Sequence, residues 1–167
     1  GTIAHRCADR KDIKVIIASG DMDTLQCVDK KRVQVYTLKK GIKDTVIYDE
    51  VAVKERFGFP PKLVPDYKGL RGDPSDNIPG IAGIGEKTAT ELITGFGSID
   101  DIYKKLKKDE QQFLDAGIKP RIVNLLKDGE EEAQFSKMLA IIRTDAPVGC
   151  ELPDHHWKGG VDTDHVL

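Results

Sequence analysis

Two kinds of hydrophobic pattern divide the chain. Residues 13–19 form a continuous apolar, β-branched run, which is typical of a buried parallel strand. Residues 32–38 alternate, with Val33, Val35 and Thr37 on one side, and residues 44–48 form a third short apolar run. Residues 49–58 begin with acids and end at a glycine, as a helix does. The first 59 residues therefore predict a small α/β region.

From Pro60 onward the apolar residues recur at helical spacing, and no convincing strand pattern follows. A short helix is expected around 60–70, and further helices at 86–97, 98–106, 119–129 and 130–144, with Ser98 as a cap. The faces expected to be buried are Ala89, Leu92, Ile93 and Phe96; Ile99, Ile102, Tyr103 and Leu106; and Phe135, Met138, Leu139 and Ile142.

These patterns predict an α/β part at 1–59, an all-helical part at 60–145 and an irregular tail at 146–167. The first residues resemble the last turns of a helix, with Ile3 and Cys7 on one face. Two or three strands are marginal as an independent sheet, so we expect a fragment whose N-terminal part is missing. A tag-derived Gly1 before a true N-terminus is the alternative.

Composition narrows the function only slightly. The 167 residues carry a net charge of −2, so charge alone does not indicate nucleic acid. Three distant cysteines favour neither a disulfide framework nor a zinc knuckle, and fit reduced thiols in the cytosol. No apolar run has the length of a membrane span, and no signal peptide is visible.

Two pairs of acids are candidate metal ligands. Asp21 and Asp23 follow the first expected strand, at the strand end where open parallel sheets bind ligands. Asp73 and Asp76 lie around Pro74, in a helix-start pattern that presents both carboxylates from one turn. Carboxylates suit Mg²⁺ or Mn²⁺. A solvated acidic turn and simple helix capping remain the alternatives.

The stretch "GIAGIGEKTA" is more specific. Gly83 and Gly85 permit close backbone approach, and the following helix offers free N–H groups to an anion, with Lys87 and Thr88 in its first turn. Ile81 and Ile84 would anchor the loop, as in a helix–hairpin–helix module that grips backbone phosphates. A tight connection between packed helices is the alternative.

Four segments of the chain together resemble a known family. "YKGLRGDPSDNIPGIAGIGEKTATELITGFGSIDDI", with "IIASGDMDTLQCV", "VYTLKKGI" and "FSKMLAIIRTDAPV", is similar to the 5′-nuclease domain of bacterial DNA polymerase I and its flap-endonuclease relatives. The resemblance covers about residues 1–150. It implies a PIN-like α/β core followed by a helix–hairpin–helix subdomain, and a metal-dependent 5′-3′ exonuclease or flap endonuclease of DNA replication and repair.

By motif position, the resemblance implies second-metal, catalytic acids and a duplex-binding hairpin that also holds a monovalent cation such as K⁺. The acids are Asp21, Asp23, Asp73 and Asp76, and the hairpin residues are Gly83, Ile84, Gly85, Glu86, Lys87 and Thr88. The family's first-metal acids and its basic arch lie upstream of the matching region. We therefore expect the isolated chain to bind Mg²⁺ or Mn²⁺ and duplex DNA weakly, and to cleave little.

The resemblance also implies partners: duplex or flap DNA, a missing N-terminal half, and a fused polymerase. A monomer in the cytoplasm, near the nucleoid, is expected. The rival hypothesis is a non-catalytic DNA-binding module that uses its acids structurally, and a third is a short nuclease completed by another chain. His155 and His156 could be ligands, but scattered histidines in a tail are more often solvated.

Overall fold

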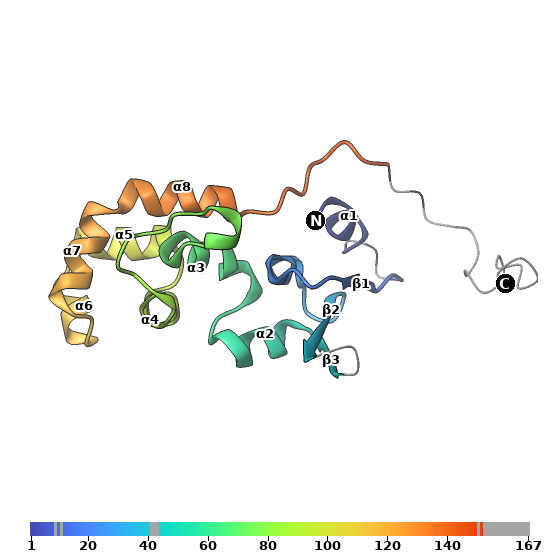
Figure 1. Ribbon diagram of the computed structural model, residues 1–167, viewed down its shortest axis with the longest axis horizontal. Coiled ribbons are helices and arrows are strands. Elements are labelled where there is room, and N and C mark those ends of the chain that lie inside the picture. Colours follow the sequence, from blue (N-terminus) through green and yellow to red (C-terminus); the bar gives the residue numbers. More distant parts are fainter. Residues whose placement is uncertain (9, 11, 41–43, 150, 152–167) are drawn as a thin grey trace, which may run out of the picture.

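The computed structural model describes residues 1–8, 10, 12–40, 44–149 and 151, and it is a mixed α/β structure (Figure 1). A three-stranded sheet lies at one end and the helices from α3 onward lie at the other. The elements are α1 (Thr2–Ala8), β1 (Val15–Ala18), η1 (Met22–Cys27), β2 (Val33–Lys40), β3 (Asp44–Tyr48), α2 (Glu50–Phe57), η2 (Pro61–Leu63), α3 (Val64–Arg71), η3 (Pro74–Asp76), α4 (Glu86–Phe96), α5 (Ile99–Lys108), α6 (Gln111–Asp115), α7 (Pro120–Asp128) and α8 (Glu130–Ala140).

The sheet has the order β1-β2-β3, with β1 parallel and β3 antiparallel to β2. The alternation predicted for β2 is confirmed in part: Val33, Val35 and Thr37 are buried and Tyr36 and Leu38 are exposed, but Gln34, expected on the outer side, is buried as well. The prediction that the first strand is buried is wrong, since Ile16 of β1 is 52% exposed. The burial of β1 alternates, and the face of the strand that carries Ile16 and Ala18 is exposed among the described residues.

The helix predicted at 49–58 is α2, and its ends follow the expected chemistry. The Asp49 side chain caps it by accepting a hydrogen bond of 3.0 Å from the amide of Ala52. Gly58 ends it with a φ of 82°, in the left-handed region that glycine adopts without strain.

Helical spacing also predicted the core of the helical part correctly. In α4 and α5 every expected core residue is buried, and Ser98 caps α5 in a capping box with Asp101. These side chains join one hydrophobic core with Leu70 of α3 and Leu25 of η1, so the core continues from the helical part into the sheet region.

The face predicted to be buried in α8 is wrong. Phe135, Met138 and Leu139 are 50%, 61% and 48% exposed, and the helix instead buries Ala133, Ser136 and Ala140. The physical reason is a close crossing with α3. A Cβ atom on Gly69 would lie 2.9 Å from the carbonyl oxygen of Ala133, so only small side chains fit between the two helices. The two residues expected on one face of α1 differ in burial, since Ile3 is 50% exposed and Cys7 is buried.

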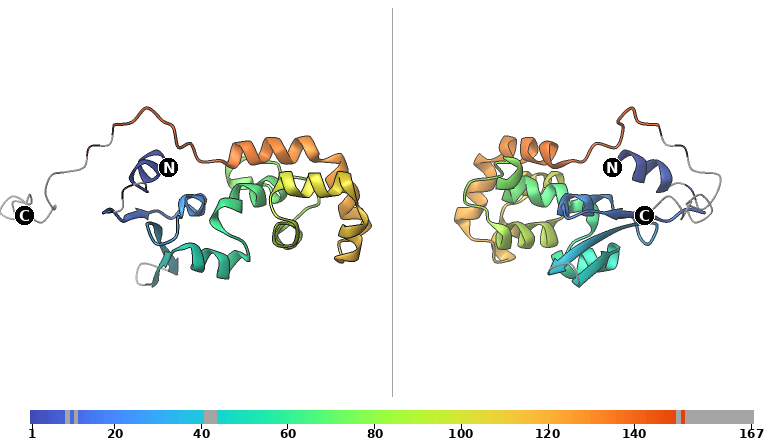
Figure 2. Two further views of the ribbon diagram at one scale, coloured as in Figure 1. Left: turned by 180° about the vertical axis from the view of Figure 1, so that it is seen from behind. Right: turned by 45° about the vertical axis from the view of Figure 1, so that its right-hand side comes forward.

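Hydrogen bonds fasten the helical part to the sheet region. The side-chain amide of Gln26 makes both bonds: its Nε2 donates to the carbonyl oxygen of Ala140 at 3.0 Å, and its Oε1 accepts from the backbone amide of Ile142 at 2.8 Å. The segment after α8 then passes back toward α1, as all views show (Figures 1 and 2), and the amide of Ala146 donates to Thr2 Oγ1 at 3.1 Å. The bonds of Gln26 tie η1 to the end of α8, and the bond of Ala146 ties the following segment to α1.

Candidate metal centre and phosphate-binding hairpin

The first pair of acids lies directly after β1. The chain leaves the strand at Ala18, and Asp21 then caps η1 by accepting a hydrogen bond of 2.8 Å from the amide of Asp23. The hydroxyl of Ser19 accepts from the amide of Asp21 at 3.1 Å and narrows the turn. Asp21 is thus occupied as a cap, and the tight turn turns Asp23 toward α3.

The second pair of acids comes from the turn after α3. Asp73 caps η3, and its Oδ1 accepts from the amide of Ser75 at 3.0 Å and from its hydroxyl at 2.6 Å. Gly72 precedes it with a φ of 77°, and a Cβ there would lie 2.5 Å from the carbonyl oxygen of Pro79. The predicted pattern of cap, proline and acid is confirmed, although the element that it starts is a single 3₁₀ turn that ends at Asp76.

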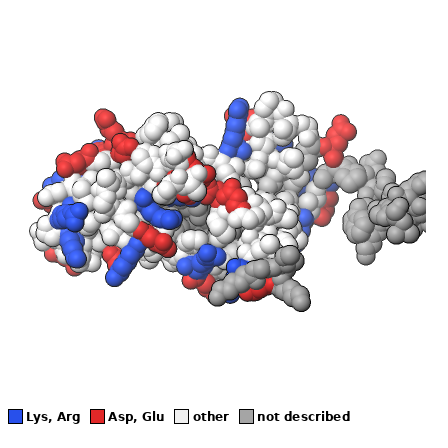
Figure 3. Space-filling model, in the orientation of Figure 1, with Lys and Arg blue, Asp and Glu red and all other residues white. Residues whose placement is uncertain are grey.

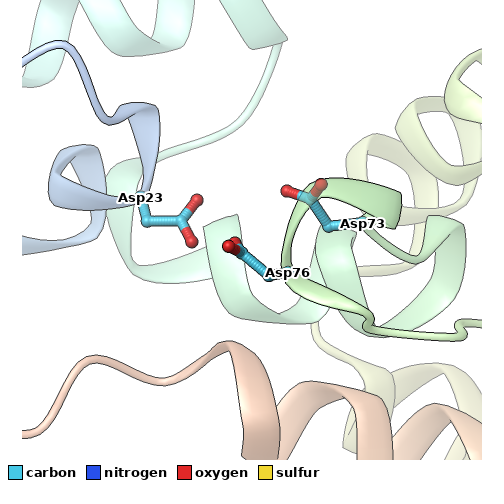
Figure 4. A group of neighbouring side chains, drawn as sticks. All are labelled: Asp23, Asp73 and Asp76. Carbon is cyan, nitrogen blue, oxygen red and sulfur yellow. The ribbon is translucent and has the colours of Figure 1, made fainter.

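Three of the four acids come together. Carboxylate oxygens of Asp23, Asp73 and Asp76 all lie within 4.8 Å of one another, and Figure 4 shows the carboxylates turned toward a common space from two separate segments. Asp21 is not in this group. It lines the same cavity, of about 440 Å³, together with Tyr67 and other residues of α3.

A lysine that sequence reasoning gave no role lies among the acids. The ammonium nitrogen of Lys68 is 2.6 Å from Asp73 Oδ2 and 3.6 Å from Asp76 Oδ2, and it also contacts Asp23 Oδ1. Its side chain is only 9% exposed. The sequence gives no local signal for this role, because the contact of Lys68 with Asp23 depends on how α3 packs against η1.

The electrostatics of the cluster follow from these contacts. The hydrogen bond from Lys68, together with that from Ser75, lowers the pKa of the Asp73 carboxyl to about 2. Burial raises the pKa of Asp23. The hydrogen bond from Lys68 works against this rise, and the charge of Asp21 adds to it. Burial alone would lower the pKa of Lys68, but its hydrogen bonds to Asp23 and Asp73 outweigh burial and raise it.

This donor set suits a hard divalent cation. Mg²⁺ and Mn²⁺ bind carboxylate oxygens, and three converging carboxylates repel one another unless a cation lies between them. The ammonium of Lys68 lies among the three carboxylates and acts as such a cation. The three carboxylates themselves, with oxygens within 4.8 Å of one another, fit a divalent ion.

The glycine hairpin has the form that the sequence predicted. Ile81 and Ile84 are 5% and 3% exposed and anchor the loop, and Gly83 has a φ of 93°. Gly85 has a φ of −92°, so this position does not require glycine for a left-handed backbone. It is the N-cap of α4, and no side chain of the described residues caps this helix. The first amides of α4, at Glu86, Lys87 and Thr88, are available to an anion.

A second basic residue beside the hairpin was missed. A Cβ on Gly83 would lie 3.0 Å from Leu125 Cδ1 and 3.6 Å from Arg121 Nη2, which places the guanidinium of Arg121, from α7, next to the loop. Sequence could not pair them, because 38 positions separate Gly83 from Arg121 and only the packing of α7 joins them. Figure 3 shows acidic and basic side chains interspersed on the face drawn.

Two other sequence-based points can be placed. His155 and His156 lie outside the described residues. No helix in the described part of the chain is both long and apolar enough to cross a membrane.

Comparison with known proteins points to one family. Residues 59–162 match the family described as 5′-3′ exonuclease, C-terminal SAM fold. DNA polymerase I of Bacillus caldotenax is 39% identical over 159 residues, covering 95% of this chain and 17% of the relative. The 5′-3′ exonuclease of Bacillus subtilis is 38% identical over 154 residues, covering 92% of this chain and 48% of the relative.

Solved structures agree on the fold. A T5 5′-exonuclease structure with bound divalent zinc ions has a TM-score of 0.61 and 23% identity, and the match covers 76% of this chain and 42% of that one. A bacteriophage T5 flap endonuclease in complex with DNA and metal ions has a TM-score of 0.65 and 21% identity, covering 83% and 47%. This chain thus spans about half the length of the exonuclease that it matches in Bacillus subtilis and a smaller part of the polymerase.

Proposed function

Because the chain belongs to the 5′-3′ exonuclease, C-terminal SAM fold family, we propose that it forms part of a metal-dependent 5′-3′ exonuclease and flap endonuclease that hydrolyses DNA. One observation carries the proposal. Three carboxylates from two separate segments converge within 4.8 Å, in a chain that also presents an uncapped helix start behind a glycine hairpin. A metal site and a phosphate site in one molecule are what a nuclease of this family requires.

Asp23, Asp73 and Asp76 would hold a Mg²⁺ or Mn²⁺ ion, with Asp21 at the margin of the cavity. A bound divalent ion supplies a Lewis acid that polarises a phosphate oxygen or activates water. The role of the chain is to keep the acids in place. Asp21 orients the backbone at Asp23, and Asp73, through its bonds to Ser75, holds the turn that presents Asp76. Similar sites in nucleases use two ions, and we extend that scheme to the whole protein.

The hairpin would hold the DNA backbone. Amides at the start of α4 and the side chains of Lys87 and Arg121 offer donors and positive charge to phosphate oxygens. Such contacts position a duplex without reading its sequence. We also propose that the backbone of the loop at Gly83–Thr88 holds a monovalent cation such as K⁺ near the phosphates.

The proposal also covers the partners, substrates and location of the chain. The polymerase I relatives are several times longer than this chain, so a polymerase segment and an N-terminal nuclease segment are the proposed covalent or assembled partners. We propose duplex and flap DNA as substrates, a monomeric state and a cytoplasmic location near the nucleoid.

A titration with Mn²⁺ tests the metal site. The wild-type chain and the Asp21→Asn/Asp23→Asn double variant are compared by isothermal calorimetry. Loss of binding in the double variant is expected, because it removes one of the three converging carboxylates and the charge at the margin of the cavity. Equal binding would contradict the site and would favour a non-catalytic DNA-binding module in which the acids are structural.

A further inference from the structure

The position of Lys68 has a consequence for the proposed metal site, on which this inference rests. Its ammonium contacts all three converging carboxylates, and no other described basic side chain makes an ion pair with Asp23, Asp73 or Asp76. It is also the most buried of the lysine side chains in described ion pairs, at 9% exposed. Lys68 therefore neutralises a large part of the repulsion between the acids.

An ammonium group and a divalent cation compete for the same oxygens. The carboxylate oxygens lie within 4.8 Å of one another, which leaves room for one cation in contact with all of them. A divalent ion at van der Waals distance from a lysine ammonium would meet strong repulsion here, because the Lys68 and Asp23 side chains are only 9% and 15% exposed and bulk water screens them little. The two cations therefore exclude each other from the centre of the cluster.

We infer that Lys68 is a built-in counter-cation that holds the acid cluster together before metal binds, and that an incoming divalent ion must displace its ammonium group. The cavity of about 440 Å³ that Lys68 shares with the acids gives the ammonium space to swing aside while α3 stays in place. Lys68 then acts as a positioning residue: it preserves the geometry of the empty site and lowers the affinity of that site for metal.

The test compares Lys68→Met with the wild-type chain. Methionine approximates the apolar stem of lysine up to Cε and removes the ammonium group. We expect Mn²⁺ to bind Lys68→Met at least about tenfold more tightly in calorimetry, which corresponds to about 1.4 kcal/mol. We also expect a lower melting temperature without metal and a larger rise in it on adding Mn²⁺. Equal or weaker Mn²⁺ binding by Lys68→Met would overturn the inference.

Two further variants separate the causes. Lys137→Met removes another partly buried lysine, which contacts Asp66 and Asp100 instead of the cluster, and should leave Mn²⁺ affinity unchanged. Lys68→Arg keeps the charge and should not bind Mn²⁺ more tightly than the wild type. If Lys68→Met is unfolded without metal, refolding on addition of Mn²⁺ supports the inference, and failure to refold at saturating Mn²⁺ contradicts it.

Failure of this inference can be told apart from failure of the proposed metal site. Asp73→Asn removes a carboxylate of the cluster and should weaken Mn²⁺ binding. If Asp73→Asn binds like the wild type, the metal site itself is wrong, and the inference falls with it. If Asp73→Asn loses binding while Lys68→Met matches the wild type, only the role of Lys68 is wrong.

Discussion

The close crossing of α3 and α8 can be tested at Gly69. A Cβ at this position would lie 2.6 Å from Ile99 Cδ1, 2.9 Å from the carbonyl oxygen of Ala133 and 3.0 Å from Lys137 Cβ. The end of an isoleucine side chain can rotate away, but the carbonyl oxygen of Ala133 can move only with α8. Gly69→Ala should therefore force the two helices apart.

The size of the effect is a difference between two opposing contributions. Alanine is favoured over glycine inside a helix by about 1 kcal/mol. Overpacking of a tight core contact costs about 1–3 kcal/mol, and the backbone contact with Ala133 places Gly69 at the upper end. The net loss in the free energy of unfolding should be about 2 kcal/mol, or about 4–8 °C in melting temperature for a chain of this length.

Gly95→Ala provides the matched control. Gly95 also lies within a helix, α4, but a Cβ there meets nothing within 4 Å. It should therefore leave stability unchanged or raise it by up to about 1 kcal/mol. Urea denaturation followed by circular dichroism measures both variants. The packing argument would be refuted if Gly69→Ala were as stable as the wild type or more stable.

Three further predictions concern charged groups. Asp66→Ala should lower the free energy of unfolding, measured by urea denaturation, by about 3 kcal/mol. Buried Asp66 accepts hydrogen bonds from the first backbone amide of α5 and from Lys137, and an unchanged stability would contradict this role. The carboxyl of Asp73 has a folded-state pKa of about 2 against an ordinary 3.8, so its stabilisation is present above pH 3.8 and is lost as the pH falls through about 2. Asp73→Asn should flatten that acid limb of a stability profile, and an unchanged limb would argue against the ion pair. Lys87→Ala and Arg121→Ala should each reduce the salt dependence of duplex DNA binding by about one unit of log–log slope, whatever the sequence, as fluorescence anisotropy at several salt concentrations can show.

The sequence predicted the elements whose large side chains face the core. Helical spacing identified the buried faces of α4 and α5 because Leu92, Phe96 and Ile102 are both large and inward. The same argument failed for α8, where the packing partner is the glycine of α3 and the buried residues are small. Amphipathicity indicates where large apolar side chains lie along a helix, and it cannot reveal that a neighbouring helix approaches too closely for them.

The parts of the site that depend on neighbouring residues in the sequence could be predicted. The cap at Asp73 and the anchoring of the hairpin by Ile84 follow from residue types and spacing within a few positions. The roles of Lys68 and Arg121 arise from tertiary contacts, one between α3 and η1 and one between α7 and the hairpin. Such contacts depend on how helices pack and have no signature in local sequence.

The location of a bound metal ion tests the proposed metal site and the role of Lys68 together. Crystals of the chain grown with Mn²⁺ are measured at a wavelength where manganese scatters anomalously. We expect an anomalous peak among the carboxylates of Asp23, Asp73 and Asp76, with the ammonium of Lys68 moved away from it. A peak elsewhere, or no peak at saturating Mn²⁺ with Lys68 still among the three acids, would contradict this expectation.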